Sequence, residues 1–97
     1  MIVEGVDPRD IDWKSDRPAY RVYFWKLPPA PLGVAQEQVM WHCDEYRLTG
    51  ATDVDEVLGW AREQVKAEQT FVVYVECGGP PRKGLVRLWG VDPNADA

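Results

Sequence analysis

One segment of this 97-residue chain differs from the rest in the spacing of its apolar residues, and this difference constrains the fold most. Between residues 52 and 68, apolar side chains recur at i, i+3, i+4, i+7 and i+11, which is one face of an amphipathic helix. They are Val54, Val57, Leu58, Ala61 and Val65. Asp53 or Thr52 is placed to cap the amino end, with Glu56 or Asp55 reaching back three residues later. The sequence therefore predicts a helix with one apolar face.

Two segments on each side of this helix are rich in aromatic and β-branched residues, as β-strands are. The expected strands cover residues 19–27, 38–48, 70–77 and 85–91. Proline-rich residues 28–33 and glycine-rich residues 78–84 separate the two members of each pair. This order predicts an α+β fold of ββαββ type, with a four-stranded, mainly antiparallel sheet and the helix packed on one face. The two strands that flank the helix are expected to run parallel.

The length allows one domain at most. We assign residues 19–91 to this ββαββ domain and residues 92–97 to a frayed C-terminal tail. Residues 1–18 contain several turn-forming Asp and Pro residues and predict a partly ordered N-terminal arm, with a short strand at Ile2 and Val3.

Charge and the N-terminal sequence narrow the classes of partner and compartment. Sixteen acidic residues against eleven basic ones leave a formal net charge of −5. This balance makes nucleic acid an unlikely partner and fits a basic partner protein better. The N-terminus lacks the features of a signal peptide, and no apolar run approaches the ~20 residues of a membrane span. We therefore expect a cytoplasmic protein with reduced cysteines and no membrane partner.

The segment "VMWHCDEYRLTG" places His42 and Cys43 side by side, but neighbouring residues of a strand point to opposite faces. We expect Cys43 on the face that the helix covers, as a buried apolar residue, and too far from Cys77 for a disulfide. On the other face, His42 is expected with Asp44 and Tyr46. One His and two Cys without C-x-x-C spacing are too few for a zinc site, so no metal or cofactor is predicted.

One helix covers one face of a sheet, so the opposite face is expected to stay open. Its predicted residues form an aromatic interaction face made of Tyr23, Trp25, His42, Tyr46, Tyr74, Arg87 and Trp89. Large exposed apolar patches mark interaction sites, and Trp, Tyr and Arg are enriched at interface hot spots. The alternative is that the N-terminal arm covers this face through Ile11 and Trp13. A register slip of one residue would move a strand's side chains to the other face.

These observations predict a small acidic protein-interaction module and point away from an enzyme. The module would form a homodimer or bind a basic partner protein through the aromatic face, for example as an inhibitor or immunity-type protein. A second hypothesis is a small-molecule-binding protein or small enzyme that uses His42 with Asp44 and Tyr46, in a pocket edged by Trp25 and Trp89. A third is a single-stranded nucleic-acid binder, because aromatic side chains on an open sheet stack on bases.

Overall fold

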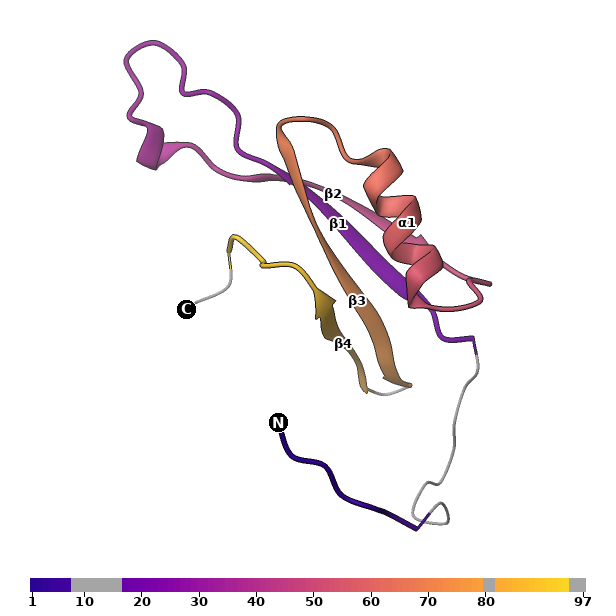
Figure 1. The fold of residues 1–97 in the computed structure, drawn as a ribbon. Helices are drawn as coiled ribbons and strands as arrows, with labels where there is room; N and C mark the ends of the chain where they lie inside the picture. The colour runs from indigo at the N-terminus through magenta and orange to yellow at the C-terminus, as the bar shows by residue number, and fades with distance from the viewer. Residues whose placement is uncertain (8–16, 80–81, 95–97) are drawn as a thin grey trace.

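A computed structural model describes residues 1–7, 17–79 and 82–94. The described residues contain one sheet with strand order β2-β1-β3-β4, in which every neighbouring pair is antiparallel. Its elements are β1 (Tyr20–Lys26), a short 3-10 helix η2 (Gln36–Gln38), β2 (His42–Leu48), α1 (Val54–Gln64), β3 (Gln69–Gly79) and β4 (Arg82–Trp89). The predicted α+β fold of ββαββ type is confirmed (Figure 1).

Strand β1 is central because α1 carries the chain from one side of β1 to the other. Val22 of β1 pairs with Tyr46 of β2 on one side and with Val73 of β3 on the other. Strands β2 and β3 therefore run in the same direction, as expected, but are not neighbours. This order leaves β2 and β4 as the two edge strands of the sheet.

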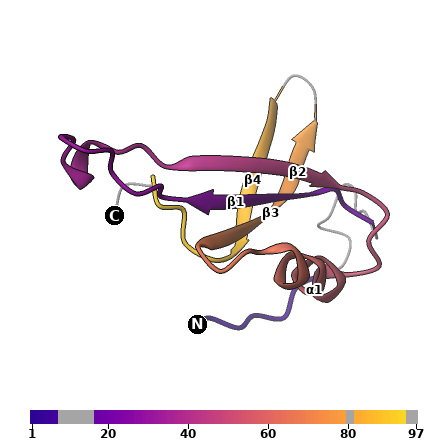
Figure 2. The same ribbon diagram turned by 90° about the horizontal axis from the view of Figure 1, so that it is seen from above.

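The core lies between α1 and one face of the sheet, and Figure 2 shows the helix on that single side. The predicted apolar stripe of the helix is confirmed, since Val57 and Ala61 are fully buried. The other three stripe residues, Val54, Leu58 and Val65, pack against the core at partial burial. The buried core residues are Tyr20, Val22, Phe24, Ala51, Val57, Ala61, Phe71 and Val73. No helix of the described residues has the length and apolar character needed to cross a membrane.

Polar side chains close the amino end of α1 in the predicted way. The Asp53 carboxylate accepts a hydrogen bond from the Glu56 backbone N–H at 3.0 Å. The Glu56 carboxylate in turn accepts one from the backbone N–H of Thr52 at 2.8 Å. Both contacts satisfy N–H groups at the helix start, which have no partner within the helix. Asp53 is therefore the cap residue.

Several predicted boundaries differ from the observed ones. Strand β2 begins at His42, four residues later than expected, because η2 takes up residues 36–38. The β3–β4 hairpin is longer than expected, and Gly78 adopts a positive φ of 76° in a part of β3 that we predicted as loop. Ile2 and Val3 are exposed and do not form a strand, so that prediction was wrong. Ile11 and Trp13 lie outside the described residues.

Replacing Asp53 with Ala should lower the free energy of unfolding by about 1 kcal/mol, because the cap hydrogen bond to Glu56 is lost. Asp55 lies in the same first turn but is not the cap residue, so Asp55→Ala serves as the matched control with a smaller effect. Chemical denaturation of the two variants measures the difference. Equal stability losses would show that Asp53 stabilises the helix only through its charge.

Candidate functional site

The face of the sheet opposite α1, called the open face below, carries side chains from all four strands. The pairing register and the alternation of side chains along each strand assign its members. They are Arg21, Tyr23 and Trp25 of β1, Cys43, Glu45 and Arg47 of β2, Val72, Tyr74 and Glu76 of β3, and Lys83, Leu85 and Arg87 of β4. These side chains divide into an ionic group near the β3–β4 hairpin and an aromatic group at the other end.

The ionic group is centred on Glu76, whose side chain is only 6% exposed. Its carboxylate accepts hydrogen bonds from Arg47 Nε at 2.7 Å and Nη2 at 3.0 Å, and from Arg21 Nε at 2.7 Å. Lys83 Nζ lies 2.8 Å from the same carboxylate, and Arg21 also pairs with Glu45. The hydrogen bonds from Arg47 and Lys83, followed by that from Arg21, hold the pKa of Glu76 well below its ordinary value. Glu76 is therefore ionised and fully engaged.

The aromatic group consists of half-buried rings that pack on one another. Tyr23 meets Tyr74 edge-on with ring centroids 5.1 Å apart, and Trp25 lies 6.4 Å from Tyr23. The Tyr74 hydroxyl donates to Asp92 Oδ2 at 3.1 Å, so the chain after β4 returns to this face. Burial, together with this hydrogen bond, raises the pKa of Tyr74 to about 12. Trp25 Nε1 is buried without a hydrogen-bond partner among the described residues.

The structure brings only part of the predicted interaction face together. Tyr23, Trp25, Tyr74 and Arg87 lie on the open face, as expected. The remaining three residues, His42, Tyr46 and Trp89, lie on the helix side of the sheet, so their predicted placement was wrong. Sequence reasoning also gave Glu76 no special role, because two of its three partners, Arg21 and Arg47, lie far from it in the chain.

In β2 the two faces are exchanged relative to the prediction. Cys43 pairs with Trp25 and so lies on the open face, where it is exposed; its predicted core position was wrong. Tyr46 instead lies on the helix side, where it is 49% exposed and its ring is edge-on to Phe24 and Trp60 at centroid distances of 5.7 Å each. The alternation of side chains along β2 was predicted correctly. Which of the two alternating sets faces the helix is decided by the pairing with β1, and the prediction chose the wrong set.

In β4 an irregularity changes the alternation. Leu88 is an extra residue in the pairing with β3, and it places Trp89 opposite Val73 on the helix side. The Trp89 ring stacks on Phe71 with centroids 4.5 Å apart and planes inclined by 16°. Regular alternation from Arg87 would have put Trp89 on the open face. No glycine or proline within residues 85–89 signals this bulge.

Both cysteines are free, as expected from their separation. Loss of hydration raises the pKa of the Cys43 thiol, and the Glu45 and Asp44 carboxylates raise it further. A thiol with a raised pKa is mostly protonated near neutral pH and is a weak nucleophile. The exposed Cys43 therefore has none of the activation that a catalytic cysteine needs.

The residues of the predicted small-molecule site do not form one pocket. Asp44 and Tyr46 line a hollow of about 250 Å³ between β2 and the end of α1, but His42 is not among its lining residues. Trp25 and Trp89 lie on opposite faces of the sheet and cannot wall a common pocket. The described residues hold no cluster of three or more His, Cys, Asp or Glu side chains suited to a metal ion.

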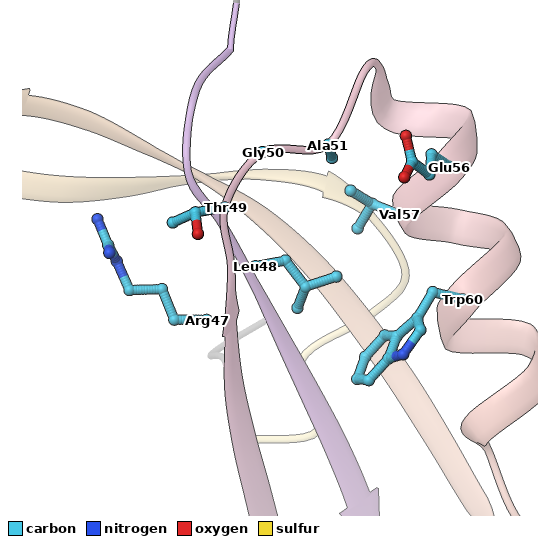
Figure 3. A pocket seen from close by; sticks show the side chains of 8 residues that line it. All are labelled: Arg47, Leu48, Thr49, Gly50, Ala51, Glu56, Val57 and Trp60. Atoms are coloured by element: carbon cyan, nitrogen blue, oxygen red, sulfur yellow. The ribbon is translucent and has the colours of Figure 1, made fainter.

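A second hollow, of about 340 Å³, lies between the end of β2 and the start of α1 (Figure 3). Figure 3 shows Leu48, Val57 and Trp60 facing the space between strand and helix, whereas Arg47 points away from the helix. Arg47 is bound in the ionic group, and the Glu56 carboxylate is engaged at the helix start. The two charged groups of this hollow thus have partners elsewhere, unlike the converging polar groups of a ligand site.

An exposed apolar surface lies at β4, the edge strand beyond β3. Every residue of β4 is exposed. Four large apolar side chains are between 40% and 49% exposed: Leu85, Val86, Leu88 and Trp89. Beside them, on the helix side, is an open hollow of about 560 Å³ whose apolar lining residues are Val65, Phe71, Trp89, Val91 and Pro93. We call the outer backbone of β4 and these four side chains the β4 edge.

The two edge strands differ in charge. Strand β4 contains three basic residues, Arg82, Lys83 and Arg87, and no acidic residue. Strand β2 carries both signs, with the acidic residues Asp44 and Glu45 and the basic residue Arg47. Sequence reasoning missed the β4 edge because the order of the strands, and hence the identity of the edges, was not predictable.

Replacing Glu76 with Gln should lower the stability and flatten its dependence on acid pH. The pKa of Glu76 is lowered by folding, so its contribution is present above the ordinary value of about 4.3 and is lost as the pH falls below it. Chemical denaturation at neutral pH and at several acidic pH values measures both effects. Glu45→Gln is the control, because Glu45 pairs with one cation, Arg21, among the described residues and is more exposed. An unchanged acid slope in Glu76→Gln would contradict this role.

Tyr74 should ionise about two pH units above an ordinary tyrosine, near pH 12. Because folding raises this pKa, its contribution to stability is present below about pH 10 and is lost as the pH rises toward 12. Absorbance titration of tyrosinate, compared between the wild type and Tyr74→Phe, identifies the group. Asp92→Asn should bring the pKa only part of the way down, because burial is the larger cause. A return to about 10 in that variant would show that burial contributes little.

No protein-family model, curated protein or solved structure matches this chain. The case for its function therefore rests on the arrangement of its own residues.

Proposed function

We propose that this protein is a small interaction module that associates with itself through the β4 edge. The observation that carries this proposal is an edge strand of eight exposed residues, four of them large and apolar. Edge strands offer unpaired N–H and C=O groups to another strand, and exposed apolar side chains add the burial that makes pairing stable.

Charge favours a second copy over a basic partner at this edge. Lys83 is already paired with Glu76, but Arg82 and Arg87 would repel a basic protein, although the net charge of −5 had suggested such a partner. A copy of this chain carries an excess of acidic residues and can offer them to β4. We also place the protein in the cytoplasm, where the free thiols of Cys43 and Cys77 would remain reduced.

The open face gives less support to nucleic-acid binding. Its cations Arg21, Arg47 and Lys83 are already held by carboxylates, mainly that of Glu76. The aromatic rings pack on one another, and the Asp92 carboxylate beside them would repel a phosphate backbone. The second alternative, a ligand site around His42, has little support because His42 does not line the hollow that contains Asp44 and Tyr46.

A basic side chain placed on the β4 edge should weaken self-association without unfolding the monomer. Val86 is 49% exposed, so Val86→Lys costs little core packing but places a desolvated charge in any interface. We expect the dissociation constant of the dimer to rise by about tenfold or more, which is ~1.4 kcal/mol. Light scattering or sedimentation over a range of concentrations measures it.

Leu32→Lys provides the matched control, because Leu32 is fully exposed in the β1–β2 connection, away from β4. This variant should associate like the wild type, and thermal melting should show both variants folded. A wild type that stays monomeric at every concentration would refute the proposal, as would equal association of Val86→Lys and wild type.

A further inference from the structure

We propose that the hollow between β2 and the end of α1 binds a small zwitterion with a methylated ammonium group, such as a betaine. The hollow combines aromatic rings with one acidic and one basic side chain. It differs from the small-molecule site predicted from the sequence, because His42, Trp25 and Trp89 take no part in it. It also lies at the β2 edge of the sheet, opposite the β4 edge, so this inference does not depend on self-association.

Three aromatic rings, called the ring cluster below, line one part of the hollow. Phe24 of β1, Tyr46 of β2 and Trp60 of α1 bring them together from three elements. The centroids of Phe24 and Trp60 are 5.8 Å apart, and Tyr46 is edge-on to both rings at 5.7 Å. Phe24 is buried, but Trp60 is only half-buried and Tyr46 is 49% exposed. The two outer rings therefore keep aromatic surface that packing within the core does not use.

Inclined aromatic rings beside an open space favour a methylated ammonium group. The face of an aromatic ring attracts a cation within about 6 Å of its centroid, and groups of such rings bind quaternary ammonium ions. A quaternary ammonium ion also has no N–H donor that would lose a hydrogen bond against apolar rings. Since the three centroids lie 5.7 to 5.8 Å apart, one cation above the ring cluster can be near all three.

Two charged side chains of opposite sign line the same hollow. Asp44 lies two residues before Tyr46 in β2 and is paired with Phe24 of β1, which places it on the helix side beside the ring cluster. Lys66 follows the end of α1. Neither residue belongs to an ion pair among the described residues, and both are exposed. The hollow therefore offers a negative and a positive group that are not engaged with each other.

These charges select a zwitterion over a simple cation. Asp44 adds to the attraction for an ammonium group, whereas Lys66 would repel a ligand that carries positive charge alone. Lys66 instead suits an anionic group on the same molecule. Gln69 accepts a hydrogen bond from the Lys66 backbone N–H at 3.0 Å through Oε1, which leaves its NH2 group to donate to that anion. The volume of about 250 Å³ suits a small ligand of this kind.

An NMR titration with glycine betaine tests the site, with the indole N–H signal of Trp60 as the reporter. Loss of one indole signal in Trp60→Phe assigns it. We expect saturable shifts with betaine and binding weaker by about fivefold or more for tert-butylacetate, in which carbon replaces the ammonium nitrogen. Tetramethylammonium, which lacks the anionic group, should also bind more weakly than betaine. Equal binding of betaine and tert-butylacetate, or no saturable shift with betaine, would overturn the proposal.

Two substitutions separate the charges, and both affect exposed residues, so the fold should persist. Asp44→Asn should weaken betaine binding by about fivefold. Lys66→Gln should also weaken betaine binding but strengthen that of tetramethylammonium, because a repelling charge is removed. Glu63→Gln is the control, since Glu63 is an exposed acidic residue of α1 that does not line the hollow. Equal betaine binding by Asp44→Asn and Glu63→Gln would contradict the site. Val86→Lys should bind betaine like the wild type, so the results distinguish this proposal from self-association at β4.

Discussion

The packing of a single short helix against one face of the sheet governs what the rest of this protein exposes. Helix α1 has eleven residues and extends for ~16 Å. Its buried residues, Val57 and Ala61, join a sheet core of β1 and β3 residues. Strand β4 lies beyond this core, and its apolar side chains consequently remain in solvent although they share the sheet. The exposed edge is thus a direct consequence of having one helix for four strands.

On the open face, which no helix covers, side chains instead form polar and aromatic contacts within the chain. Glu76 gathers Arg21, Arg47 and Lys83 from three different strands, which ties β1, β2 and β4 to β3 on the side that has no helix. The aromatic rings at the other end pack together, and Asp92 binds Tyr74. This face was predicted to be the interaction surface, yet three of its cations are held by Glu76 and its tyrosine rings pack on one another. The unpartnered apolar surface lies at the β4 edge.

The two edges of the sheet differ in what they offer to a second copy. Strand β4 exposes four large apolar side chains, whereas β2 carries both acidic and basic side chains, of which Glu45 and Arg47 are held in the ionic group. The proposed self-association therefore uses one edge, and a dimer formed there would leave β2 as the outer strand on each side.

The sequence by itself determined the elements that depend on local spacing. The period of Val54, Val57 and Ala61 predicted α1, and Asp53 predicted its start, because helix caps and apolar stripes are read within a few residues. Alternating aromatic and β-branched residues likewise predicted the four strands and so the α+β fold.

Only the tertiary structure decided which faces and edges these strands present. Cys43 and Tyr46 lie on the faces opposite to those predicted, because the register between β1 and β2 depends on pairing across the chain. A shift of one residue in that register reverses the face of every side chain. The bulge at Leu88 likewise places Trp89 on the face opposite to the predicted one. The Glu76 cluster and the β4 edge follow from the strand order, which is set by how the helix returns the chain across β1. Contacts between distant residues carry no local signal, so alternation alone could not reveal them.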